Sequence, residues 1–112
     1  MSLEGCPSQA EIGVMSLTIE AFDDPDDFGR FDNRTDRLLI CPNMKPGQTV
    51  DTLLHEILHA IGEAYGIPQL RGNSKRTEDL IRQLAPALMM FKRDNPALDM
   101  WLLKEAVRSR GV

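Results

Sequence analysis

Apolar and polar residues alternate along one stretch near the start of the chain. In residues 15–21, every second residue is apolar, so these side chains would lie on the same side of an extended backbone. They are Met15, Leu17, Ile19 and Ala21. Polar side chains occupy the positions between them. A period of two residues is typical of a strand with one buried face. We therefore predict a first strand over residues 15–21.

Two short apolar segments follow, at residues 28–32 and 37–41, with the turn-forming residues 33–36 between them. This arrangement predicts a β-hairpin. Leu38, Leu39 and Ile40 are consecutive, so we expect the second strand of the hairpin to be covered on both faces. The sheet is thus predicted to occupy about residues 12–41.

The acidic residues 23–27, which include Pro25, interrupt the strand pattern. Charged and proline-containing segments of this kind are typical of solvated loops. A calcium site is the alternative interpretation, but the segment lacks the ligand spacing and the later glutamate of an EF-hand loop. We expect a loop without a bound ion.

The strongest helical pattern lies at about residues 49–65. Its apolar residues recur at intervals of three and four, as the side chains on one helix face do. They are Val50, Leu53, Leu54, Ile57, Leu58 and Ile61. Thr49 is suited to the N-cap and Gly66 to the C-terminal end. We predict one helix with these six residues facing the core.

Two more helices are predicted towards the C-terminus, at about residues 77–93 and 96–109. Pro86 should kink or break the first, because proline removes a backbone donor and clashes with the preceding turn. Asn95 is suited to cap the second, which we expect to carry Trp101 and Leu102 onto the core. Strands followed by helices predict an α+β fold, with a small antiparallel-containing sheet beside the helix of residues 49–65.

Composition and charge narrow the class of protein. A chain of 112 residues fits one domain spanning residues 1–112. The net charge of -4 disfavours a nucleic-acid partner, since such surfaces need clustered lysine and arginine. The longest apolar run, residues 84–91, is far short of a membrane span, and no secretory segment follows the N-terminus. We expect a cytoplasmic protein with no membrane partner, in which Cys6 and Cys41 are reduced thiols.

Residues 55–59 read HEILH, and they fall inside the predicted helix. His55 and His59 lie one turn apart, so their rings can bind one cation, while Glu56 lies beside the metal and can transfer a proton. On a helical wheel all three lie outside the apolar wedge. The alternative is two ordinary helix histidines. However, the chain contains two histidines in all, and random placement gives this spacing on the order of once in a thousand.

A catalytic zinc ion normally takes three protein ligands and leaves one position open. Glu78 is our choice for the third ligand, because eighteen residues separate it from His59 and include a loop that contains glycine and proline. At the start of the next helix, the helix dipole would favour its ionised form. Glu63 is the rival, but three ligands in one row on a helix cannot surround a tetrahedral ion. Asp79 and Cys41 remain further alternatives.

These residues resemble the gluzincin type of HExxH zinc metallopeptidase. The similarity is closest to the short, phage-encoded proteins related to the ImmA/IrrE metallopeptidases. It runs from the hairpin through TLLHEILHAIGEAYG and RTEDLIRQLAPAL to the last helix, or about three quarters of the chain. The resemblance implies His55, His59 and Glu78 as zinc ligands, Glu56 as general acid and base, and a zincin-like α+β fold.

The sequence accordingly predicts a zinc-dependent peptide-bond hydrolase. The resemblance suggests a specific protein or peptide substrate in a phage or prophage setting. Two alternatives stay open. One is a binding or regulatory module in which zinc, closed by a fourth ligand such as Cys41 or Cys6, holds the fold together. The other is a scaffold without metal. The oligomeric state is left open by the sequence.

Overall fold

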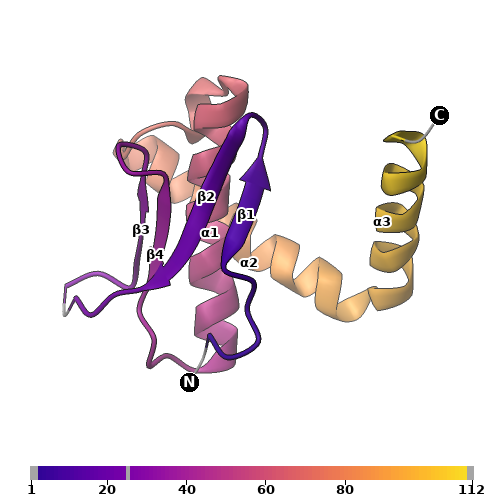
Figure 1. The fold of residues 1–112 in the computed structure, drawn as a ribbon, viewed down its shortest axis with the longest axis horizontal. Helices are drawn as coiled ribbons and strands as arrows, with labels where there is room; N and C mark the ends of the chain where they lie inside the picture. Colours follow the sequence, from indigo (N-terminus) through magenta and orange to yellow (C-terminus); the bar gives the residue numbers. More distant parts are fainter. Residues whose placement is uncertain (1–2, 25, 111–112) are drawn as a thin grey trace.

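The computed structural model describes residues 3–24 and 26–110 and has an α+β fold (Figure 1). The elements of the described residues follow one another as four strands, a helix, a short 3-10 turn and two further helices. They are β1 (Gln9–Ile12), β2 (Met15–Ala21), β3 (Gly29–Asp32), β4 (Arg37–Ile40), α1 (Pro46–Tyr65), the turn Pro68–Leu70, α2 (Lys75–Asp94) and α3 (Pro96–Arg110). The predicted α+β class is confirmed.

The strands form a mixed sheet in the order β1-β2-β4-β3. The pairs β1–β2 and β3–β4 are antiparallel, whereas β2 and β4 run parallel. The predicted first strand coincides with β2, and the predicted hairpin is β3–β4. β4 lies between two strands, and its residues Leu38, Leu39 and Ile40 are all buried, as expected. β3 is left at one edge of the sheet.

β1 lies outside the predicted strands, which were expected to begin at about residue 12. Its four residues, Gln9–Ile12, are too few and too polar to form a clear alternating pattern. They become a strand because Gly13, with a left-handed φ of 60°, turns the chain back and pairs Ile12 with Met15. Residues 23, 24, 26 and 27 lie outside helices and strands, which agrees with the predicted loop, and Pro25 lies outside the described residues. Arg30 pairs with Asp24 and Asp27 of this loop.

α1 packs across the sheet on one side and against α2 on the other (Figure 1). Its residues Leu53 and Ile57 pack on the sheet, Leu54 and Leu58 pack towards α2, and Ile61 contacts both clusters. Val50 is 44% exposed, so its predicted place in the core is wrong. It lies in the first turns of the helix, where neither neighbour covers it.

The start of α1 differs from the prediction. The helix begins at Pro46 with Lys45 at the N-cap, so Thr49 is not the cap. Proline at the first helical position is well tolerated because its missing N–H would be unpaired there. Thr49 lies instead inside the first turn and donates its hydroxyl to the Lys45 carbonyl. Gly66 ends the helix in the left-handed conformation, as predicted.

α2 begins at Lys75, two residues before the predicted start, because the Ser74 hydroxyl accepts a hydrogen bond from the Thr77 N–H and caps the helix. The helix continues through Pro86, so the predicted break does not occur.

α3 begins at Pro96, as expected, but Trp101 is 58% exposed and Leu102 is 46% exposed. Their predicted place in the core is wrong, because α2 carries α3 away from the sheet (Figure 1). Among the described helices, none is long and apolar enough to cross a membrane.

Candidate metal centre

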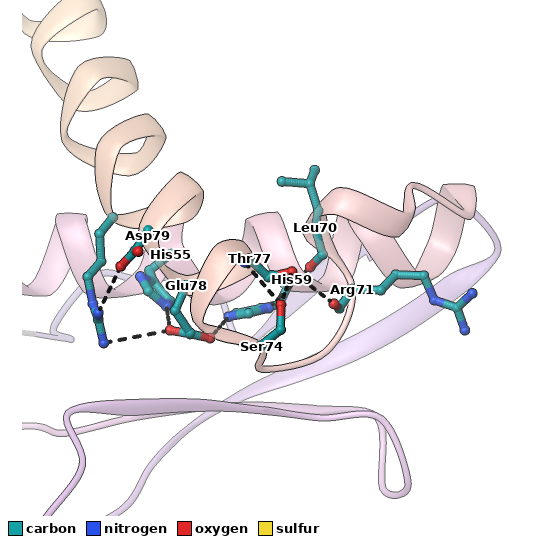
Figure 2. Close-up of polar contacts among 9 residues, drawn as sticks. His55, His59, Leu70, Arg71, Ser74, Thr77, Glu78 and Asp79 are labelled. Atoms are coloured by element: carbon teal, nitrogen blue, oxygen red, sulfur yellow. Dashed lines mark hydrogen bonds and ion pairs between the residues drawn. The ribbon is translucent and has the colours of Figure 1, made fainter.

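α1 and α2 bring His55, His59 and Glu78 together (Figure 2). The two carboxylate oxygens of Glu78 face one imidazole each. Oε2 lies 3.1 Å from His55 Nε2, and Oε1 lies 2.9 Å from His59 Nε2. The ligand atoms of the three residues all lie within 4.8 Å of one another. The structure therefore places Glu78, from a separate helix, against both histidines of the HEILH segment.

The orientation of His59 is set by the return of the chain after α1. Its Nδ1 lies 3.2 Å from the carbonyl oxygen of Leu70. Since a carbonyl can only accept a hydrogen bond, Nδ1 must donate and carry the proton. Nε2, on the Glu78 side, is then the nitrogen left with a lone pair for a cation.

Glu78 is positioned by the capped start of α2. It lies in the first turn of that helix, where unpaired N–H groups favour a negative charge. Thr77 is buried beside it, exchanges hydrogen bonds with the Ser74 cap and donates its hydroxyl to the carbonyl of Arg71 (Figure 2). This network fixes the loop before α2, and so fixes the direction from which Glu78 approaches the histidines.

The three residues suit a metal ion in number and spacing. Two imidazoles and one carboxylate at about 2.1 Å from a tetrahedral ion would have ligand atoms about 3.4 Å apart. The distances of 2.9 and 3.1 Å from Glu78 to the histidines are close to that separation. Burial is the largest influence on the pKa of His55 and lowers it, which favours the neutral ring that a metal needs. The cluster can therefore hold a metal ion.

The other residues considered from the sequence lie outside this cluster. Glu63 forms an ion pair with Arg71 at 3.2 Å. Asp79 pairs with Lys75 and Arg82. Within residues 3–24 and 26–110, neither Cys6 nor Cys41 joins His55, His59 and Glu78, and both cysteines are free thiols. A fourth protein ligand from these side chains is therefore not provided in the described part of the chain.

Glu56 is more deeply buried than the helical wheel indicated, with 8% of its surface exposed. Strand β3 covers it: a β-carbon built on Gly29 would lie 3.3 Å from Glu56 Cγ, and 2.6 Å from Thr52 Cγ2. Burial, followed by the charges of Asp27 and Glu78, raises the pKa of Glu56 to about 7. A carboxyl group with this pKa can bind or release a proton near neutral pH.

The cluster and Glu56 open into one cleft of about 780 Å³. Residues 27–31 form one wall, and α1 with the start of α2 forms the other. Arg30, Asn73 and Arg82 contribute polar side chains to the lining. Asp51, one turn before His55, also lines the cleft, and its Oδ1 is buried without a hydrogen-bond partner in the described structure. These lining residues could not be identified from the sequence, because β3 and α2 meet α1 only in the folded chain.

We compared the chain with protein families, curated proteins and solved structures. No protein family, no curated protein and no solved structure matches the chain at a significant level.

Proposed function

We propose that this protein is a zinc-dependent hydrolase that cleaves peptide bonds. In this proposal His55, His59 and Glu78 hold the zinc ion and Glu56 is the catalytic acid and base. The observation that carries it is the Glu78 carboxylate between the two histidine Nε2 atoms, in the same cleft as a glutamate whose pKa is raised to about 7. The zincin-like resemblance of the HEILH segment agrees with this assignment.

Zinc is the metal that we favour because the ligand set has two imidazoles and one carboxylate, a combination used in catalytic zinc sites. When bound, zinc supplies a Lewis acid for a carbonyl and lowers the pKa of a coordinated water to about 7. A site closed by four protein ligands would favour a structural role instead. The described residues supply three, which supports the catalytic interpretation over the binding module.

Glu56 would carry the proton in the reaction. Its carboxylate accepts a proton from the attacking water and returns it to the nitrogen of the leaving group. Glu56 follows His55 on the helix and is covered by β3. It is therefore held next to His55, His59 and Glu78 without being one of the three proposed ligands. Burial disfavours its charged form, so the proton taken up in the first step is readily kept until the second.

The shape of the cleft supports a peptide as the substrate. β3 is an edge strand, and its residues Gly29, Arg30 and Phe31 line the cleft beside the metal cluster. An extended peptide can pair its backbone with the free edge of a strand. Such pairing would bring the peptide backbone into the cleft that contains His55, His59 and Glu78. The phage or prophage setting, with one specific protein as substrate in the cytoplasm, is proposed on the resemblance alone.

The test combines metal content with cleavage. Metal-free protein is loaded with zinc and incubated with a degenerate peptide library and with candidate phage repressors, and the products are identified by mass spectrometry. The wild type should bind about one zinc ion and cleave. Glu56→Gln should bind the same amount and cleave nothing, because the change removes the proton acceptor but no ligand. Equal cleavage by both proteins would refute the role of Glu56, and zinc bound without any cleavage would favour the binding module.

A further inference from the structure

The end of α2 and all of α3 carry a large exposed apolar surface. We call residues 84–110 the helical arm. Among the described residues, fourteen large apolar side chains are exposed, and ten of them belong to the arm. They are Leu84, Leu88, Met90, Phe91, Leu98, Met100, Trp101, Leu102, Leu103 and Val107. An apolar surface concentrated in this way marks an interaction site.

α3 is apolar on two opposite sides. At about 100° per residue, Leu98 and Leu102 lie within about 40° of each other, and Met100, Leu103 and Val107 share a wedge of about 60° on the far side. A helix that is apolar all round is normally buried. Among the described residues, α3 contacts the end of α2 (Figure 1). There Lys92 forms an ion pair with Asp99 at 3.1 Å. The apolar side chains on both sides of α3 stay about half exposed, so neither side is covered within the described part of the chain.

The chain exposes more surface than a compact monomer of the same mass would, and the difference is as large as a dimer interface. The accessible surface is 7871 Å², whereas a compact monomer of 12.6 kDa would expose about 6200 Å². The difference, about 1700 Å² per chain, is roughly twice the 800 Å² that one partner buries in a standard interface. Two chains would together bury about 3400 Å², which falls in the range of permanent homodimers. A small ligand or a short peptide would not cover so much surface.

Charge and shape point to the body of a second copy as the partner. The arm contains five Lys or Arg and three Asp or Glu, whereas the rest of the chain contains eight and fourteen. A basic arm is therefore attracted to an acidic body. That body has a shallow groove lined by Ala10, Glu11, Ile12, Ile57, Ile61 and Tyr65, in which Tyr65 is 64% exposed. Oligomers most often contain two identical copies related by a two-fold axis.

We infer that the helical arm of one chain docks on the groove between β1 and α1 of a second copy, and that the second copy returns the same contact. The resulting homodimer buries the Met100, Leu103 and Val107 side of α3, and Trp101, about 100° from Met100 on the helical wheel, lies at the edge of the contact. This inference does not depend on the proposed hydrolase function, because Glu78 of the candidate metal site lies at the opposite end of α2 from the arm.

Sedimentation velocity and the fluorescence of Trp101, the single tryptophan, test the inference on the full chain. Interfaces of standard size or larger have dissociation constants of about 1 µM or below. At concentrations up to about 100 µM, the wild type should therefore reach twice the 12.6 kDa mass in sedimentation. Its tryptophan emission should shift to shorter wavelength as the dimer forms. A monomer throughout this range, with the emission of a water-exposed indole, would overturn the inference.

Variants locate the contact. Val107→Glu and Leu103→Glu place a charge on exposed positions of α3, so they should leave the circular dichroism spectrum unchanged and abolish the dimer. Tyr65→Glu should weaken dimerisation from the groove side. Val14→Glu is the matched control, because Val14 is 99% exposed in the β1–β2 turn and belongs to neither surface. A dimer that persists in the α3 variants, or one that is insensitive to Tyr65→Glu, would contradict the proposed contact.

Discussion

Gly62 of α1 and Leu70 of the following turn lie so close together that no side chain fits between them. A β-carbon built on Gly62 would lie 2.6 Å from Leu70 Cβ and 2.9 Å from the Leu70 carbonyl oxygen. That carbonyl is the group that accepts the hydrogen bond from His59 Nδ1. Because position 62 has no side chain, Leu70 can approach α1 and orient the ring of His59, a residue of the candidate metal site one turn earlier on the same helix.

We predict that Gly62→Ala lowers zinc affinity by roughly 10-fold, because the turn must move and release the His59 ring. Crowding against backbone atoms should cost about 1 to 3 kcal/mol of unfolding free energy, partly offset by the better helix propensity of alanine. Chelator competition and urea unfolding measure the two effects. Gly47→Ala is the control, since a β-carbon there meets nothing within 4 Å, and it should lose neither affinity nor stability. Equal behaviour of the two variants would show that the Gly62 contact is not needed.

Glu78→Ala and Glu63→Ala should differ sharply in zinc binding. Glu78→Ala leaves two histidines in the cluster and should weaken zinc binding by more than the roughly 100-fold upper limit for residues that only support a ligand. Glu63→Ala removes an ion pair with Arg71 on the surface, which should change affinity little. Competition with a chromophoric chelator places both variants on one scale. Zinc loss in Glu63→Ala alone would exclude Glu78 as the third ligand.

The raised pKa of Glu56 predicts a pH dependence of stability in the metal-free protein. The unfolded chain releases this proton near pH 4.5 and the folded chain keeps it to about pH 7, so unfolding releases a proton between these values. The contribution of Glu56 is thus full below pH 4.5 and is lost as the pH rises through 7. It amounts to about 3 kcal/mol.

Unfolding free energies at pH 4.5 and pH 8 in the presence of a chelator measure this loss. Glu56→Gln is the control, because it keeps the shape of the side chain and removes its titration. The wild type should lose about 3 kcal/mol more than this variant between the two pH values. His55, whose pKa is lowered, acts in the opposite direction but does so in both proteins. Parallel pH profiles for the two proteins would mean that Glu56 titrates normally.

Ile81 of α2 should be a main source of stability for the contact between α1 and α2. Its side chain is fully buried in the cluster with Leu58, Leu70 and Ala85. Ile81→Ala should therefore cost about 2 to 5 kcal/mol of unfolding free energy, measured by urea denaturation. Leu84→Ala, one turn later on the exposed arm, should cost less than about 1 kcal/mol. A similar loss in both variants would contradict the division of α2 into a side that is buried against α1, with Ile81 and Ala85, and an exposed side that carries Leu84.

The sequence by itself determined the elements whose pattern is local and strong. Alternation over seven residues was enough to define β2, and intervals of three and four residues predicted the helix that contains His55, Glu56 and His59. It also placed Glu78 at the start of a second helix. These features follow from side-chain periodicity and capping, which depend only on neighbouring residues.

The tertiary structure decided everything that depends on a partner distant in the chain. β1 exists because β2 pairs with it, and Glu56 is buried because Gly29 allows β3 to lie over α1. Glu78 rather than Glu63 lies against the histidines because the turn at Leu70 reverses the chain. Trp101 is exposed because α2 carries α3 away from the core. Periodicity states which side of an element is apolar, but burial also requires another surface to cover that side, and the position of that surface is set only by the folded chain.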